Sequence, residues 1–123
     1  MSARAIIEAT SAVPFPGSKV QQIVYHGTGQ KFRRFRRGTQ GIIWFTSDRE
    51  KVVAREVGAQ GHGYIVSAYV DIKNPADWEA YNRLLLAQFQ GDGLDGAVLP
   101  TQTGFDCFVF DPSQVRIVEV IPL

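Results

Sequence analysis

The sequence predicts one α+β domain that is dominated by strands and carries two main helices. Six short apolar runs, bounded by glycine and proline turns, are typical of strands. Two further segments carry helix start and stop signals, with apolar residues at helical spacing. A length of 123 residues suits a single core. We therefore expect residues 1–123 to form one domain, with residues 1–20 as a lead-in segment.

The composition places the chain among ordinary globular proteins. It is 45% apolar and 20% charged, with a net charge of +1, which excludes the disordered and collagen-like classes. The single Cys107 excludes an internal disulfide framework and a multi-cysteine zinc site. The N-terminal stretch lacks the long apolar run of a secretory signal, and no run reaches transmembrane length. We expect a cytoplasmic protein without membrane contact.

The first half of the chain carries two expected strands. The prolines and the glycine of SAVPFPGSK limit any helix in the lead-in to a short one. Residues 21–26 form the first expected strand, and a glycine-bounded basic loop follows it. The run GIIWFTS, residues 41–47, consists of β-branched and aromatic residues without a polar alternation. This pattern favours a strand that is buried on both faces.

The first expected helix follows directly, in SDREKVVAREVG. Ser47 and Glu50 have the spacing of an S-x-x-E capping box, in which each side chain satisfies a backbone N–H at the helix start. Gly58 supplies a stop signal. Val53 and Val57, four residues apart, are expected to form the buried stripe.

The second half carries one helix and four strands. Residues 63–72 alternate between an apolar face and a mixed face, as a strand does. The segment ADWEAYNRLLLAQFQG, residues 76–91, is expected to form the second helix. Its apolar stripe consists of Trp78, Tyr81, Leu85 and Phe89. The three remaining strands are expected at residues 97–100, 106–112 and 114–121.

The most informative histidine is His26, where an apolar strand gives way to His-Gly-Thr-Gly. It is either bonded to backbone at the strand end or part of a ligand site. Gly27 lets a ligand approach the backbone closely, and Thr28 adds a hydroxyl. His62 lies in a glycine-rich loop and is expected to face solvent. Neither histidine has the spacing of a metal-binding pair, so we expect no metal.

Among the acidic residues, Asp106 is the candidate for chemistry. It opens the strand CFVF, and a carboxylate at the mouth of a strand can point into a cleft. Asp95 and Asp111 lie in turn sequences and are expected to be structural. No serine or cysteine nucleophile motif is present.

The segment KFRRFRR, residues 31–37, holds five cations and two phenylalanines. It is either a solvated loop or a grip for the phosphates of a dinucleotide or a nucleic acid, and the two interpretations stay open. The chain has no Walker loop and no Rossmann glycine fingerprint, so a nucleotide would have to be bound in another way.

Three blocks, VYHGTG, GIIWFTSDREKVVAREV and FDCFVFDPSQVRIVEV, resemble the ADP-ribosyltransferase superfamily when taken in order. The resemblance extends over residues 21–121 and is strongest to the small ADP-ribosyltransferase-like domains, some of them toxin-like, of bacterial and phage polyvalent proteins. It implies a split β-sheet with NAD+ between its halves. It also implies an enzyme that cleaves the nicotinamide–ribose bond and transfers ADP-ribose to a protein or nucleic-acid acceptor.

The resemblance also assigns roles, by analogy with the His-Tyr-Glu triad of the diphtheria-toxin-like and poly-ADP-ribose-polymerase-like branch. His26 would bond the ribose hydroxyls, and the Gly27 backbone would hold the carboxamide. Phe45 stands at the tyrosine position and would stack on nicotinamide. Asp106 stands at the glutamate position and would stabilise the developing ribosyl cation. Glu56 stands where the branch has a second stacking aromatic.

The remaining expected NAD+ contacts are Thr28, Thr46, Arg33 and Arg36. Asp111 and Gln114 match the strand-end signature and are expected to be structural. Glu119 is the next candidate for the carboxylate role if Asp106 does not carry it.

Two alternatives remain open. An RNA 2′-phosphotransferase also has YHGT and a TSD segment, and KFRRFRR would suit RNA phosphates. We rank it second because such enzymes normally carry an extra domain with an Arg-His pair, and these 123 residues contain no such domain. The other alternative is a degenerate fold that binds NAD+ or a protein partner without catalysis, which the departures at Phe45, Glu56 and Asp106 would explain.

Overall fold

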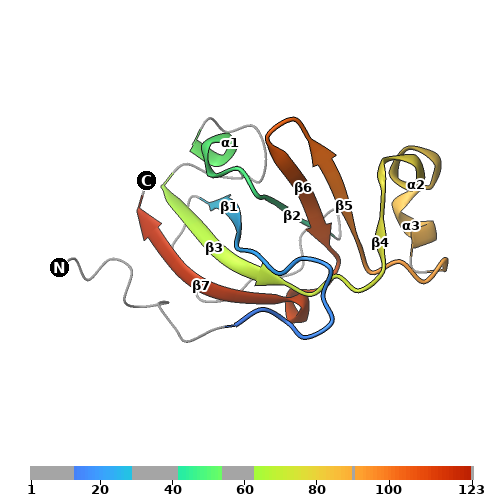
Figure 1. Ribbon diagram of the computed structural model, residues 1–123, viewed down its shortest axis with the longest axis horizontal. Coiled ribbons are helices and arrows are strands. Elements are labelled where there is room, and N and C mark those ends of the chain that lie inside the picture. The colour runs from blue at the N-terminus through green and yellow to red at the C-terminus, as the bar shows by residue number, and fades with distance from the viewer. Residues whose placement is uncertain (1–12, 29–41, 54–62, 90, 123) are drawn as a thin grey trace.

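The computed structural model describes residues 13–28, 42–53, 63–89 and 91–122. Seven strands form one sheet in the order β4-β5-β6-β2-β1-β3-β7 (Figure 1). The strands are β1 (Val24–Thr28), β2 (Ile43–Thr46), β3 (Tyr64–Val70), β4 (Pro75–Ala76), β5 (Gly96–Thr101), β6 (Gly104–Val109) and β7 (Val115–Pro122). The helices are α1 (Arg49–Val53), α2 (Trp78–Arg83) and α3 (Leu86–Phe89), with a 3-10 helix at Pro112–Gln114. The predicted α+β class is confirmed, and the α-helices lie in the two expected ranges.

The sheet is divided between β1 and β2. These two strands share one register pair, Tyr25 with Thr46. By contrast, β1 pairs with β3 from Val24 to Thr28, and β2 pairs with β6 from Ile43 to Thr46. One half is therefore β7-β3-β1 and the other is β2-β6-β5-β4, which Figure 1 shows on the left and the right. This arrangement is consistent with the expected split-sheet core.

Alternation along the strands produces two apolar clusters. The first packs Phe45, Val66 and Cys107 with their neighbours, and all three are fully buried. The second gathers Phe89, Phe108 and other residues on the opposite face of the right half, where α2 and α3 lie. Burying such a side chain stabilises the fold by about 1.5–3 kcal/mol. In the run GIIWFTS the buried residues include Ile43, Phe45 and Thr46, so β2 is buried on both faces, as predicted; Gly41 lies outside the described residues.

The lead-in segment is part of the fold from residue 13 onward. Ser18 Oγ donates to the carbonyl of Val70 at 2.8 Å and accepts from the N–H groups of Val20 and Ile72, at 3.1 and 3.0 Å. Lys19 N donates to Ile72 O at 2.7 Å. Ser18 therefore fastens this segment across the end of β3 and brings Val20 into the first cluster.

The start of α1 differs from the prediction. Asp48, and not Ser47, caps the helix, because Asp48 Oδ1 accepts from Glu50 N at 3.0 Å. Ser47 still belongs to the ladder with β6, where its Oγ accepts from the N–H of Phe105 at 2.9 Å. The buried residue of α1 is Val52, whereas Val53 is 45% exposed. Val57 and Gly58 lie outside the described residues.

The second predicted helix is two helices. Asp77 caps α2 by accepting from Ala80 N at 2.9 Å, but the helix ends at Leu84, which is extended. The predicted stripe was wrong at Trp78 and Leu85, which are 41% and 72% exposed. The break allows Leu84 to pack against the second apolar cluster. The two-residue strand β4 was also missed, because it is too short to show a pattern.

Gln114 joins three segments of backbone. Its Oε1 accepts from the N–H groups of Phe110 and Asp111, at 3.1 and 3.0 Å. Its Nε2 donates to the carbonyls of Asp71 and Asp95, at 2.9 and 2.7 Å. All four bonds go to main-chain groups, so the predicted structural role of Gln114 is confirmed.

Asp95 and Asp111 act in the same place. Asp95 accepts from the N–H groups of Lys73 and Asn74, both at 2.8 Å. Asp111 caps the 3-10 helix by accepting from Ser113 N at 2.9 Å. We call Asp95, Asp111 and Gln114 the Gln114 corner. The structural roles predicted for both aspartates are confirmed.

Candidate functional site

His26 lies in β1 at the split, with 3% of its surface exposed. Its Nδ1 lies 2.8 Å from the carbonyl oxygen of Trp44 in β2. Because a carbonyl only accepts, Nδ1 carries the proton and Nε2 of the neutral ring is an acceptor. Burial lowers the pKa of His26, and the hydrogen bond to Trp44 partly opposes this. The ring is therefore neutral near pH 7, oriented by backbone through one nitrogen.

Phe45 packs beside this histidine. The two ring centroids are 5.6 Å apart and the ring planes are tilted by 51°. Phe45 has no exposed surface and belongs to the first apolar cluster. In this structure its ring supports His26 and is not presented to a ligand.

The hydrogen-bonding direction of β1 follows from its neighbours. Ser47 N donates to Phe105 O in β6 at 2.9 Å, so the preceding residue, Thr46, directs its backbone groups toward β1. Tyr25, which is paired with Thr46, therefore directs its backbone N–H and C=O toward β2. Because this direction alternates along a strand, Gly27 also directs its N–H and C=O toward β2. No register pair joins Gly27 to β2 within the described segments. Gly27 thus directs polar backbone into the split beside His26.

Asp106 lies in β6 opposite Thr46. Its Oδ1 is 3.5 Å from Nζ of Lys51 in α1, and the side chains are 14% and 19% exposed. Gly104 brings the start of β6 against Ser47 Oγ so closely that a Cβ at this position would collide with it. The backbone carrying Asp106 is therefore held firmly against the β2–α1 turn.

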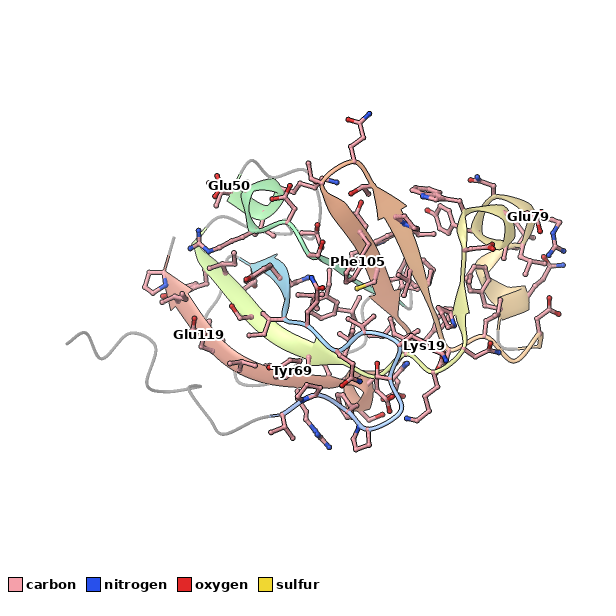
Figure 2. The ribbon with its side chains drawn as sticks, in the orientation of Figure 1. Lys19, Glu50, Tyr69, Glu79, Phe105 and Glu119 are labelled. Carbon is pink, nitrogen blue, oxygen red and sulfur yellow. The ribbon has the colours of Figure 1, made fainter. Side chains whose placement is uncertain are left out.

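The sheet register separates the proposed triad between two faces. Directly paired residues share a face, so one polar row crosses five strands. The row, which we call the polar row, consists of Glu119, Ser67, Tyr25, Thr46 and Asp106. In Figure 2, the labelled Phe105 of β6 and the labelled Glu119 of β7 lie in different halves of the sheet. His26 and Phe45 lie on the opposite face, with Cys107. The structure brings His26 and Phe45 together, but not Asp106 with them on one face.

The other predicted residues are distributed as follows. Thr28 is half-buried at the end of β1. Thr46 is fully buried, and its Oγ1 accepts from Asp48 N at 3.1 Å. Arg33, Arg36, Glu56 and His62 lie outside the described residues.

Cys107 offers no nucleophile. It is fully buried, and burial together with the negative charge of Asp106 raises the pKa of the thiol, which therefore stays protonated. In the described parts of the chain no three His, Cys, Asp or Glu residues gather to hold a metal ion. None of the described helices is long and apolar enough to cross a membrane.

Two contributors to the site were missed from the sequence. The carbonyl of Trp44 orients His26, and Lys51 pairs with Asp106. A main-chain group carries no sequence signal. Lys51 carries no such signal either. It is 55 residues from Asp106 in the chain, and the two meet only because β2 pairs with β6.

Comparison with known proteins gives one match. A family model described as ADP-ribosyltransferase in polyvalent proteins matches residues 20–88. No curated protein and no solved structure matches the chain. The matched range includes His26, Gly27 and Phe45 but ends before Asp106. Because the match covers more than half of the 123 residues, the chain belongs to the ADP-ribosyltransferase family of polyvalent proteins.

Proposed function

We propose that this domain binds NAD+ in the split between β1 and β2 and transfers ADP-ribose to a protein or nucleic-acid acceptor in the cytoplasm. The observation that carries the proposal is His26, held neutral and oriented by the Trp44 carbonyl at 2.8 Å. With Nδ1 as the donor, Nε2 accepts a hydrogen bond from a ribose hydroxyl. The membership of the family supports the reaction class.

The split supplies the second contact. Gly27 directs its N–H and C=O toward β2 beyond the single register pair of the two strands. One donor and one acceptor from the same residue match the two hydrogen-bonding groups of a carboxamide, such as that of nicotinamide. Thr28 and Thr46 are proposed to line the same region, with Arg33 and Arg36 near the phosphates.

Asp106 is proposed as the carboxylate of the reaction. It lies on the face opposite His26 and one strand beyond β2, so the proposal requires the ligand to pass around the end of β2, where the pairing with β6 ends at Thr46 and Asp106. In the transfer, the bond from C1′ of the ribose to the nicotinamide nitrogen breaks, and its electron pair leaves with neutral nicotinamide. The acceptor forms the new bond to C1′ and releases its proton. A carboxylate near C1′ stabilises the positive charge in between.

Phe45 is proposed to act through His26. Its ring is fully buried against the imidazole, so it keeps the imidazole in place rather than stacking on free ligand. Direct stacking on nicotinamide would require its ring to become exposed on binding.

The binding test uses thermal denaturation with and without NAD+. NAD+ is expected to raise the melting temperature of the wild type, because a ligand that binds only the folded state stabilises it. His26→Ala should lose most of this rise. An equal rise in both proteins, or none in either, would contradict the site. A rise without release of nicotinamide would favour the degenerate NAD+-binding fold over the enzyme.

A further inference from the structure

The ion pair between Lys51 and Asp106 has features that a surface ion pair lacks. The atoms Nζ and Oδ1 are 3.5 Å apart, and both side chains are largely sheltered, at 19% and 14% exposure. The pair of Lys73 with Asp71 is shorter, at 2.6 Å, but its lysine is 55% exposed. Exposed pairs contribute little to stability. Sheltered charges are screened less by water and salt, so the contact of Lys51 with Asp106 is less screened than that of Lys73 with Asp71.

Lys51 is also well placed to orient the carboxylate. The backbone of Asp106 is fixed by its register with Thr46 on one side and Leu99 on the other. This register leaves rotation of the side chain as the remaining freedom. Lys51 engages Oδ1 from α1, and among the described residues it is the side chain that the structure shows bonded to this carboxylate.

We infer that Lys51 is a positioning residue that holds the Asp106 carboxylate toward the bound ribose, an inference that rests on the function proposed above. By engaging Oδ1, the ammonium limits rotation of the carboxylate and directs Oδ2 toward the carbon that becomes positive. Orientation of this kind acts on the chemical step and leaves ground-state binding of NAD+ largely unchanged. Lys51 itself does not contact the reacting atoms.

The test measures nicotinamide release and melting temperature for four proteins: wild type, Lys51→Met, Lys51→Arg and Lys73→Met. Lys51→Met keeps the length and apolar stem of the side chain but removes its charge. It is expected to lower kcat by about tenfold, with KM for NAD+ within about twofold. Lys51→Arg should restore most of kcat. Lys73→Met removes a lysine of the same pairing type away from the site, and its kcat should equal that of the wild type.

The outcomes separate this inference from the function on which it rests. Wild-type kcat in Lys51→Met would overturn the inference and leave the enzyme assignment intact. A loss in Lys51→Met that Lys51→Arg does not restore, with an equally large fall in melting temperature in both, would make Lys51 structural and would also overturn it. A wild type that releases no nicotinamide would overturn the proposed function, and the inference with it.

Discussion

The Gln114 corner and the end of β2 are both rich in polar groups, but they use them differently. In the corner, the two side-chain atoms of Gln114 make four hydrogen bonds, all with main-chain groups. At the end of β2, His26 is bonded to backbone through Nδ1, and Asp106 is paired with a lysine at 3.5 Å. A polar side chain that is saturated by backbone contributes to stability. A neutral imidazole and a carboxylate, by contrast, are groups that can act on a ligand.

The largest effect is expected from the buried ring of Phe45 and not from either polar group. Phe45→Ala removes a fully buried side chain of the first apolar cluster, and such substitutions destabilise by about 3–5 kcal/mol. The measurement is the free energy of unfolding from denaturant titration. Phe45→Leu, which keeps most of the apolar volume, should cost much less. A small loss in Phe45→Ala would show that the ring is not part of the core and would restore the stacking role.

The corner should respond next. Gln114→Ala removes four hydrogen bonds and leaves backbone groups of three segments without them. We expect a loss of about 3 kcal/mol, at about 1 kcal/mol for each bond with some replaced by water. The melting temperature should fall by roughly 10 °C. Nicotinamide release per folded molecule should stay unchanged. A change in it would show that the Gln114 corner also affects the candidate site.

A smaller effect is expected from pH. Burial lowers the pKa of His26 below that of the unfolded chain, whose histidine has a pKa of about 6.5. Between these two values the unfolded state binds more protons, so stability falls as pH falls below about 6.5 and is fully present above it. His26→Gln removes this dependence. The check is the difference in unfolding free energy between the two proteins from pH 5 to pH 8, and a constant difference would contradict the neutral buried histidine.

Local patterns were enough to predict most of the fold. The six predicted strands were recognised because apolar alternation and glycine turns act over a few residues. The second helix was predicted as continuous, because the stripe through Leu85 is a property of spacing alone. The helix breaks at Leu84 because this residue, and not Leu85, packs against the second apolar cluster. Tertiary packing decides this, and spacing along the chain does not reveal it.

The candidate site shows the same limit. His26 was recognised from the turn that follows it, which is local. The sequence does not reveal that Asp106 lies on the opposite face, because a face is set by register, and a shift of one residue would reverse it. The contact with Lys51 follows from the same register. The pairing of the strands, and not their existence, is therefore what the sequence could not supply.

The most direct measurement compares two aspartates by the same substitution. Asp106→Asn and Asp95→Asn each remove one negative charge without changing side-chain size, and nicotinamide release from NAD+ and melting temperature are measured for both. Asp106→Asn should lose about a hundredfold in turnover, and its melting temperature should fall much less than that of Asp95→Asn, because it loses one contact of 3.5 Å with Lys51. Asp95→Asn, which loses charge-assisted bonds to Lys73 N and Asn74 N, should melt earlier and keep its turnover per folded molecule. Equal turnover in wild type and Asp106→Asn would contradict the account.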